Sequence, residues 1–194
     1  MLFPTTLVGS YPQPDWLIDR EKLTKRYPPR MHAKELWRIP EPWMQARSEK
    51  ARQYGLRALN RALEAITGKT AVHICFGYAA VIHQKPSGYS FLPEFAGCSC
   101  HQVSIEAAQP NLDCSVLSSL AGKQTLIGCL DLNDMTIETP QTIVARIKRA
   151  LPYVARENVV LAPDCGMKYL PREVAFGKMQ AMVEGAKRLR AEFS

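Results

Sequence analysis

Four residues of the types that bind transition metals stand at the carboxyl ends of short apolar segments. His73 and Cys75 lie two apart in AVHICFG (71–77), and because side chains alternate along a strand, both point to the same side. Glu106 closes the segment QVSIE, and Cys165 lies two residues past VVLAP. Together they offer one nitrogen, two sulfurs and a carboxylate oxygen, which is a donor set that suits zinc.

Each of these residues also has a purely structural interpretation. A strand can bury a cysteine as a small apolar residue, and it can satisfy a histidine with one hydrogen bond. Two features favour the metal. Cys165 lies between Asp164 and Gly166, where core packing does not require a thiol, and burial of Glu106 would be costly without a cation or a hydrogen-bond donor.

A second group of possible ligands lies in GCSCH, which contains Cys98, Cys100 and His101. This group precedes an apolar segment instead of following one, so it is expected at the opposite rim of a parallel sheet. Residues at that rim usually serve stability. We therefore interpret Cys98 and Cys100 as free thiols, and Cys114 and Cys129 as packing residues.

The elements that would position these side chains alternate between two kinds. Short β-rich runs are expected at 6–10, 71–76, 102–106, 125–131 and 159–163.

Apolar residues at helical spacing occupy 56–66 and 143–151, and a closing helix is expected to begin near Pro171. This alternation predicts an α/β fold of parallel βα units, whose chemistry gathers at the carboxyl ends of the strands.

The composition is that of an ordinary globular domain. The chain has 194 residues, of which 46% are hydrophobic and 22% charged, so one domain over residues 1–194 is expected. Neither an export leader nor a membrane span is recognisable, and six cysteines without such a leader favour a reducing cytoplasm.

The net charge of +7 is concentrated between Arg20 and Arg61, where twelve Lys or Arg stand against four Glu. Such a segment could attract a polyanion, but solvated helix faces are the simpler interpretation. No nucleic-acid-binding motif accompanies it, and no nucleic-acid partner is expected.

Four motifs together resemble the catalytic domain of cobalamin-independent methionine synthase. They are LVGSYPQP (7–14), HICF (73–76), SIEAAQ (104–109) and LAPDCGMKYL (161–170), followed by a helix that contains KM. Their order and spacing make the match specific, and it extends over 1–37 and 43–194.

The resemblance implies a (β/α)8 barrel of the TIM type, in which zinc binds the thiol of homocysteine and presents it to a methyl donor. It assigns His73, Cys75, Glu106 and Cys165 as the zinc ligands, which is the set already reached from the strand ends. It assigns Gly9 and Ser10 to the amino-acid part of homocysteine. No proton-relay or other catalytic residue is identified.

The chain departs from the family pattern between Trp37 and Trp43, where the family would have its second and third barrel strands with their helices. The family's Asp-Glu-Pro, which ends the fourth strand, stands here as PEP, so Pro40 replaces an acidic residue that contacts the substrate. The Glu that follows the second strand and holds the substrate amino group has no counterpart. Asn133 lies near the position where long-chain members place a histidine.

The expectation is therefore an incomplete barrel with two βα units missing. The sheet would stay open, or self-association or a partner chain would complete the barrel. The leading functional prediction is a zinc-dependent homocysteine methyltransferase, with activity impaired by the internal deletion and with a folate or a corrinoid as methyl donor. The alternatives are a zinc thiol methyltransferase for another acceptor, of the coenzyme M type, and a zinc-binding remnant without catalysis.

Overall fold

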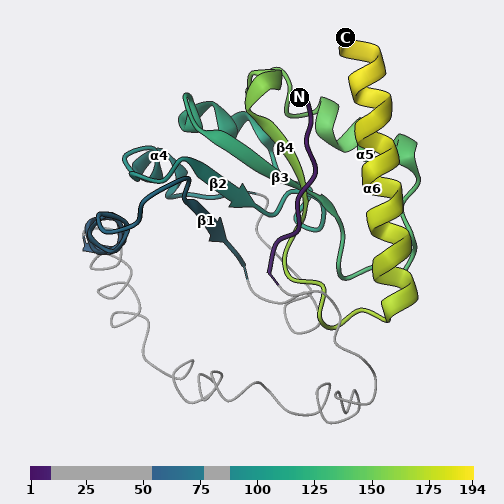
Figure 1. Cartoon of the computed structure of the whole chain (residues 1–194), viewed down its shortest axis with the longest axis horizontal. Helices are drawn as coiled ribbons and strands as arrows, with labels where there is room; N and C mark the ends of the chain where they lie inside the picture. The colour runs from purple at the N-terminus through teal and green to yellow at the C-terminus, as the bar shows by residue number, and fades with distance from the viewer. Residues whose placement is uncertain (10–53, 77–87) are drawn as a thin grey trace.

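A parallel sheet forms the centre of the molecule (Figure 1). The structure is a computed structural model, and it describes residues 1–9, 54–76 and 88–194. Within these residues the sheet has the strand order β1-β2-β3-β4, so strands adjacent in sequence are also adjacent in space. The strands are β1 (Ala71–Ile74), β2 (Gln102–Ile105), β3 (Gln124–Leu130) and β4 (Val159–Pro163).

Helices connect and cover these strands. Residues 54–63 are helical and precede β1. The other helical elements are α4 (Leu92–Phe95), η2 (Cys114–Leu120), α5 (Pro140–Lys148), η3 (Arg156–Asn158) and α6 (Arg172–Phe193). Figure 1 shows α5 and α6 side by side, and both helices contact β3.

The helix boundaries follow local chemistry. Thr139 caps α5 by accepting a hydrogen bond from the Thr142 N–H at 3.1 Å, and Pro140 occupies the first turn. The long α6 begins directly after Pro171, as the sequence predicts. The expectation that Ile66 belongs to the helix over 56–66 is wrong. Ile66 lies beyond the helix at 54–63, and its side chain is exposed.

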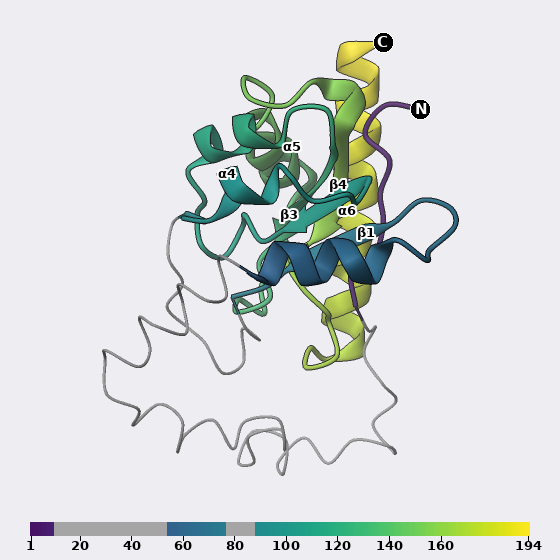
Figure 2. The same cartoon turned by 90° about the vertical axis from the view of Figure 1, so that its left-hand side faces the viewer.

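The N-terminal segment lies along β4, as Figures 1 and 2 both show. Leu161 N–H donates to the Pro4 carbonyl at 2.8 Å, and Thr6 N–H donates to the Leu161 carbonyl at 2.9 Å. The strand expected at 6–10 is thus a single parallel bridge between Thr5 and Leu161. Residues 6–9 form no strand, and Gly9 adopts a φ of 64°, which lies outside the extended region.

The sheet has a different apolar cluster on each face. Alternate residues such as Val103, Ile127 and Leu161 belong to a large core that also contains side chains of α5 and α6. Residues between them in β3 and β4, together with one residue of the N-terminal segment, form a small cluster on the other face: Val8, Leu126, Val160 and Ala162. In the barrel that the sequence resemblance implies, this smaller face would be the inside, and the alternation of β1 and β2 continues past their ends toward the candidate site.

Among the described residues, no helix combines the length and the apolarity needed to cross a lipid bilayer.

Candidate metal centre

The parallel register brings the predicted ligands from three strands together. His73 in β1 lies opposite Ser104 in β2, so two residues further along Cys75 lies beside Glu106. His73, Cys75 and Glu106 point to the same face, because strand side chains alternate with a period of two and Glu106 is two residues beyond Ser104. Cys165 follows β4 by two residues and reaches the same rim.

The ligand atoms of His73, Cys75, Glu106 and Cys165 all lie within 4.8 Å of one another. The Cys75 Sγ donates to Glu106 Oε1 at 3.1 Å, and it lies 3.3 Å from the Cys165 Sγ. In tetrahedral zinc sites the usual metal–ligand lengths separate neighbouring donor atoms by roughly 3.3 to 3.8 Å. The four side chains therefore fit a zinc ion in both chemistry and spacing.

The imidazole of His73 is oriented by a neighbour. Its Nδ1 lies 2.9 Å from the Ser104 Oγ, which is held opposite by the strand register. When Nδ1 carries the proton and donates to this hydroxyl, Nε2 is left with its lone pair available for a metal.

Burial differs across the group. His73 and Cys75 are exposed, whereas Glu106 and Cys165 are buried, so the cluster opens to solvent on the β1 side. The hydrogen bond with Cys165, together with partial burial, raises the pKa of the Cys75 thiol to about 11. Without a metal this thiol is therefore protonated at neutral pH, and it serves as the hydrogen-bond donor to Glu106.

Of the two residues predicted to bind substrate, one lies inside the described structure. Gly9 packs against the turn that carries Cys165: a Cβ on Gly9 would lie 3.0 Å from the Gly166 Cα, and its φ of 64° also favours glycine. Ser10 lies outside the described residues, as do Pro40 and its two neighbours.

Two residues near the cluster were not assigned a role from the sequence. Asp164 is fully buried and accepts hydrogen bonds from backbone N–H groups that follow Glu106, and Tyr89 is buried against the ends of β1 and β2. For Asp164, the sequence offered one indication of such a role, which is a carboxylate directly after a fully apolar strand. The sequence carried no comparable signal for Tyr89.

The alternative thiol group lies at the other end of β2. Cys98 and Cys100 are free and buried, and the Lys123 ammonium donates to the Cys100 carbonyl at 3.1 Å. His101 Nδ1 accepts from the Thr70 N–H at 3.1 Å. These contacts agree with the structural interpretation of this group.

Asn133 lies in the exposed segment after β3 and outside the four-residue cluster. A buried ion pair holds this segment against α6: Lys178 Nζ lies 2.9 Å from Glu138 Oε2 and also donates to the Thr136 carbonyl at 2.6 Å. These contacts hold the segment at Thr136 and Glu138, whereas Asn133 is exposed at the surface.

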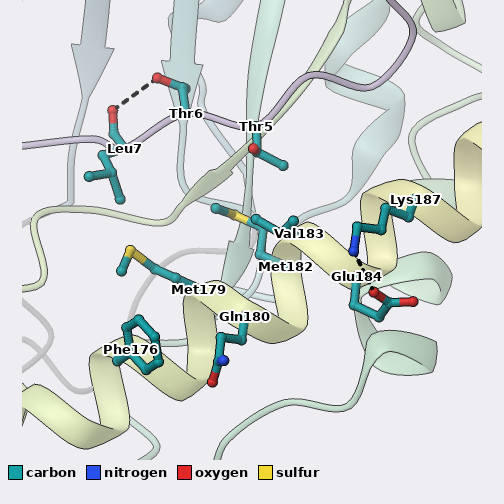
Figure 3. Close-up of a pocket in the computed structure, with 10 residues that line it drawn as sticks. All are labelled: Thr5, Thr6, Leu7, Phe176, Met179, Gln180, Met182, Val183, Glu184 and Lys187. Atoms are coloured by element: carbon teal, nitrogen blue, oxygen red, sulfur yellow. Dashed lines mark hydrogen bonds and ion pairs between the residues drawn. The ribbon is translucent and has the colours of Figure 1, made fainter.

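A groove of about 710 Å³ lies elsewhere, between the N-terminal segment and α6. Figure 3 shows Thr5, Thr6 and Leu7 on one side and α6 residues such as Phe176 and Val183 on the other. None of the four cluster residues lines it. The groove is therefore separate from the candidate metal centre.

Comparison with known proteins connects this arrangement to one group. Residues 68–188 match the catalytic-domain family described as cobalamin-independent synthase. The matched range contains all four cluster residues.

Two of the curated relatives are methionine synthases. The protein of Saccharolobus solfataricus is 31% identical over 157 residues, covering 79% of this chain and 44% of the relative. That of Thermococcus kodakarensis is 28% identical over 141 residues, covering 72% of this chain and 39% of the relative. The chain thus spans less than half the length of these relatives.

A solved structure agrees in fold. The B12-independent methionine synthase from Shewanella sp. W3-18-1, in complex with selenomethionine, superposes with a TM-score of 0.69 at 28% identity. The superposition covers 75% of this chain and 45% of that one. The four parallel strands and their helices therefore correspond to part of a TIM barrel.

Proposed function

Because this chain belongs to the cobalamin-independent synthase catalytic-domain family, we propose that it acts in methyl transfer to the thiol of homocysteine, which forms methionine. We propose further that residues 1–194 form one shortened barrel domain, and that His73, Cys75, Glu106 and Cys165 hold zinc. One observation carries the proposal: these four side chains, from three separate strands, bring their ligand atoms within 4.8 Å of one another at the carboxyl ends of the sheet.

The donor set suits thiol chemistry. When bound, zinc would supply the charge that lowers the pKa of a substrate thiol and keeps it as the nucleophilic thiolate. Cys75, Cys165 and Glu106 would contribute three anionic donors and His73 a neutral nitrogen. The exposed β1 side leaves a direction from which a substrate sulfur can approach.

The position of Gly9 supports an amino-acid substrate. It lies against Gly166 at the end of the Cys165 turn, so a molecule whose thiol reached the cluster could contact the N-terminal backbone. Among the described residues, no contact favours an acceptor of the coenzyme M type instead. The donor, a folate or a corrinoid, stays a prediction from the family resemblance.

Zinc content tests the site directly. We expect elemental analysis of the purified chain to find one zinc per chain, and we expect Cys75→Ser and Cys165→Ser to lose it. The matched control is Cys98→Ser, which changes a buried thiol at the opposite rim and should retain zinc. Full retention in both cluster variants would overturn the ligand assignment.

A further inference from the structure

Two buried side chains outside the ligand set tie the three ligand-bearing strand ends to one another. Asp164 precedes Cys165, and Tyr89 lies in the connection between β1 and β2. We infer that Asp164 and Tyr89 are positioning residues, which hold the ligands in place before zinc arrives and thereby set the affinity of the site. This inference rests on the proposed zinc site.

Asp164 links the end of β4 to the end of β2. Its Oδ1 accepts from the N–H groups of Ala107 and Ala108, both at 3.0 Å, and its Oδ2 accepts from the Gln109 N–H at 2.7 Å. The residue is fully buried. One carboxylate therefore fixes three consecutive amides that directly follow the ligand Glu106, while its own backbone leads into the ligand Cys165.

This link crosses β3, which lies between β2 and β4. The crossing is possible because position 128 in β3 is glycine. A Cβ on Gly128 would overlap Asp164 Oδ1 and would lie 2.8 Å from the Ile105 carbonyl oxygen. The sheet thus leaves a passage for the carboxylate at the level where the ligands meet.

Tyr89 provides the second link, between the ends of β1 and β2. Its hydroxyl accepts from the Glu106 N–H at 2.8 Å and donates toward the Ile74 carbonyl at 3.3 Å. Its ring stacks on Phe76, with centroids 4.3 Å apart. Glu106 is therefore fixed relative to the segment that carries His73 and Cys75.

The two links share Glu106 and its adjoining amides, so all the ligands belong to one hydrogen-bonded frame. Partners beyond the ligands typically change metal affinity 10- to 100-fold when they are removed, because the ligands then need to be ordered upon binding. The hydrogen bonds of Asp164 and Tyr89 described above go to backbone groups, so their effect should reach the metal through the position of the ligands.

The test compares zinc affinities by competition with a chromophoric chelator. Asp164→Asn keeps the size of the side chain but turns one acceptor into a donor that faces a backbone N–H. Tyr89→Phe removes only the hydroxyl. We expect zinc to bind about 10- to 100-fold more weakly to Asp164→Asn and at least severalfold more weakly to Tyr89→Phe.

The control is Ile147→Val, which loosens the buried face of α5 away from the strand ends. Ile147→Val should bind zinc as tightly as the parent chain, even where it loses as much thermal stability as Asp164→Asn or Tyr89→Phe. The ligand-field spectrum of the cobalt(II)-substituted protein adds a readout of geometry. We expect it to change in Asp164→Asn and to be unchanged in Ile147→Val.

Amide hydrogen exchange on the parent chain tests the same frame without a variant. The N–H groups of Glu106, Ala107, Ala108 and Gln109 should exchange slowly in the zinc-free protein. Rapid exchange there, or parent-like zinc affinity in both variants, would overturn the positioning role while leaving the zinc site itself intact. Failure of the parent chain to bind zinc would instead overturn the proposed function and this inference with it.

Discussion

At the scale of single residues, the thiol of Cys75 should react unusually slowly with electrophiles for an exposed cysteine. Its pKa is raised to about 11 by the hydrogen bond with Cys165 and by partial burial, and only the thiolate is nucleophilic. Raising the pH toward that pKa increases the thiolate fraction. In zinc-free protein the rate of alkylation by iodoacetamide should therefore rise about tenfold per pH unit from pH 8 to 10, as measured by mass spectrometry of the Cys75 peptide.

This experiment has one internal control and one reference value. Cys129 is fully buried in β3 and burial raises the pKa of its thiol, so it should stay unmodified across the same range. An ordinary cysteine with a pKa of ~8.5 would level off near pH 9 to 10. A Cys75 rate that reaches its plateau there would contradict the described hydrogen bond.

Sequence alone could predict that the proposed ligands gather at one place, because two simple rules apply to them. Alternation along a strand places His73 and Cys75 on one side, and the parallel arrangement gathers strand ends at one rim. The structure brings both residues together with Glu106 and Cys165.

The supporting residues did not follow from those rules. Asp164 and Tyr89 have backbone amides and carbonyls of other segments as partners, so their roles depend on the strand order and on the space above Gly128. Neither the strand order nor this space can be read from a short stretch of sequence.

At the scale of elements, the packing of α5 against α6 depends on one close approach. A Cβ on Gly185 would lie 2.7 Å from both Cβ and Cγ2 of the buried Ile143. We expect Gly185→Ala to lower the free energy of unfolding, since overpacking costs ~1 to 3 kcal/mol and the better helix propensity of alanine offsets at most ~1 kcal/mol. Urea titration followed by circular dichroism measures the difference.

Gly177→Ala is the matched control on the same helix. Its Cβ would meet Cδ1, Cγ1 and Cγ2 of Ile137, but this side chain is 47% exposed and has room to shift toward solvent. We expect this variant to be as stable as the parent or more stable by up to ~1 kcal/mol. Equal losses in the two variants would contradict the packing of α5 against α6.

Element boundaries were predictable where proline and a hydroxyl residue mark them. Pro140 with its Thr139 cap, and Pro171 before α6, locate the starts of two helices. The N-terminal strand predicted at 6–10 is reduced to a bridge at Thr5, and Gly9 beyond it lies against Gly166 with a φ of 64°. That contact joins parts of the chain more than 150 residues apart, so no window of sequence reveals it.

At the scale of the whole molecule, a (β/α)8 barrel closes on eight strands, whereas the described residues provide four strands and the bridged N-terminal segment. Large apolar side chains stay exposed in this part of the chain, including Leu7 and Phe176 at the groove of Figure 3. Each 100 Å² of bare apolar surface represents ~2.5 kcal/mol.

We therefore expect the chain to self-associate or to bind apolar dyes. Light scattering should show a mass that increases with protein concentration, and Phe176→Ser should reduce the increase. A concentration-independent monomer that excludes dye and melts in one sharp transition would contradict this expectation.

The incomplete barrel should affect the two stages of the proposed reaction differently. Binding of the homocysteine thiol requires the four-residue cluster and the rim near Gly9, both of which the chain retains. Turnover also requires the substrate ammonium and the methyl donor to be held in line. The sequence lacks the acidic groups that the family resemblance implies for the ammonium, including the one replaced by Pro40.

Losing one charge-assisted contact costs ~1.5 to 3 kcal/mol, and misplacement by ~1 Å can cost ~100-fold in rate. We therefore expect homocysteine to change the zinc-edge X-ray absorption spectrum of the purified chain, while methionine formation with folate or corrinoid donors stays slow or undetectable. Rapid turnover by the chain alone would show that the missing segment is dispensable. An unchanged absorption spectrum would remove the binding step as well, because a thiol that enters the zinc coordination sphere alters the scattering from its ligand atoms.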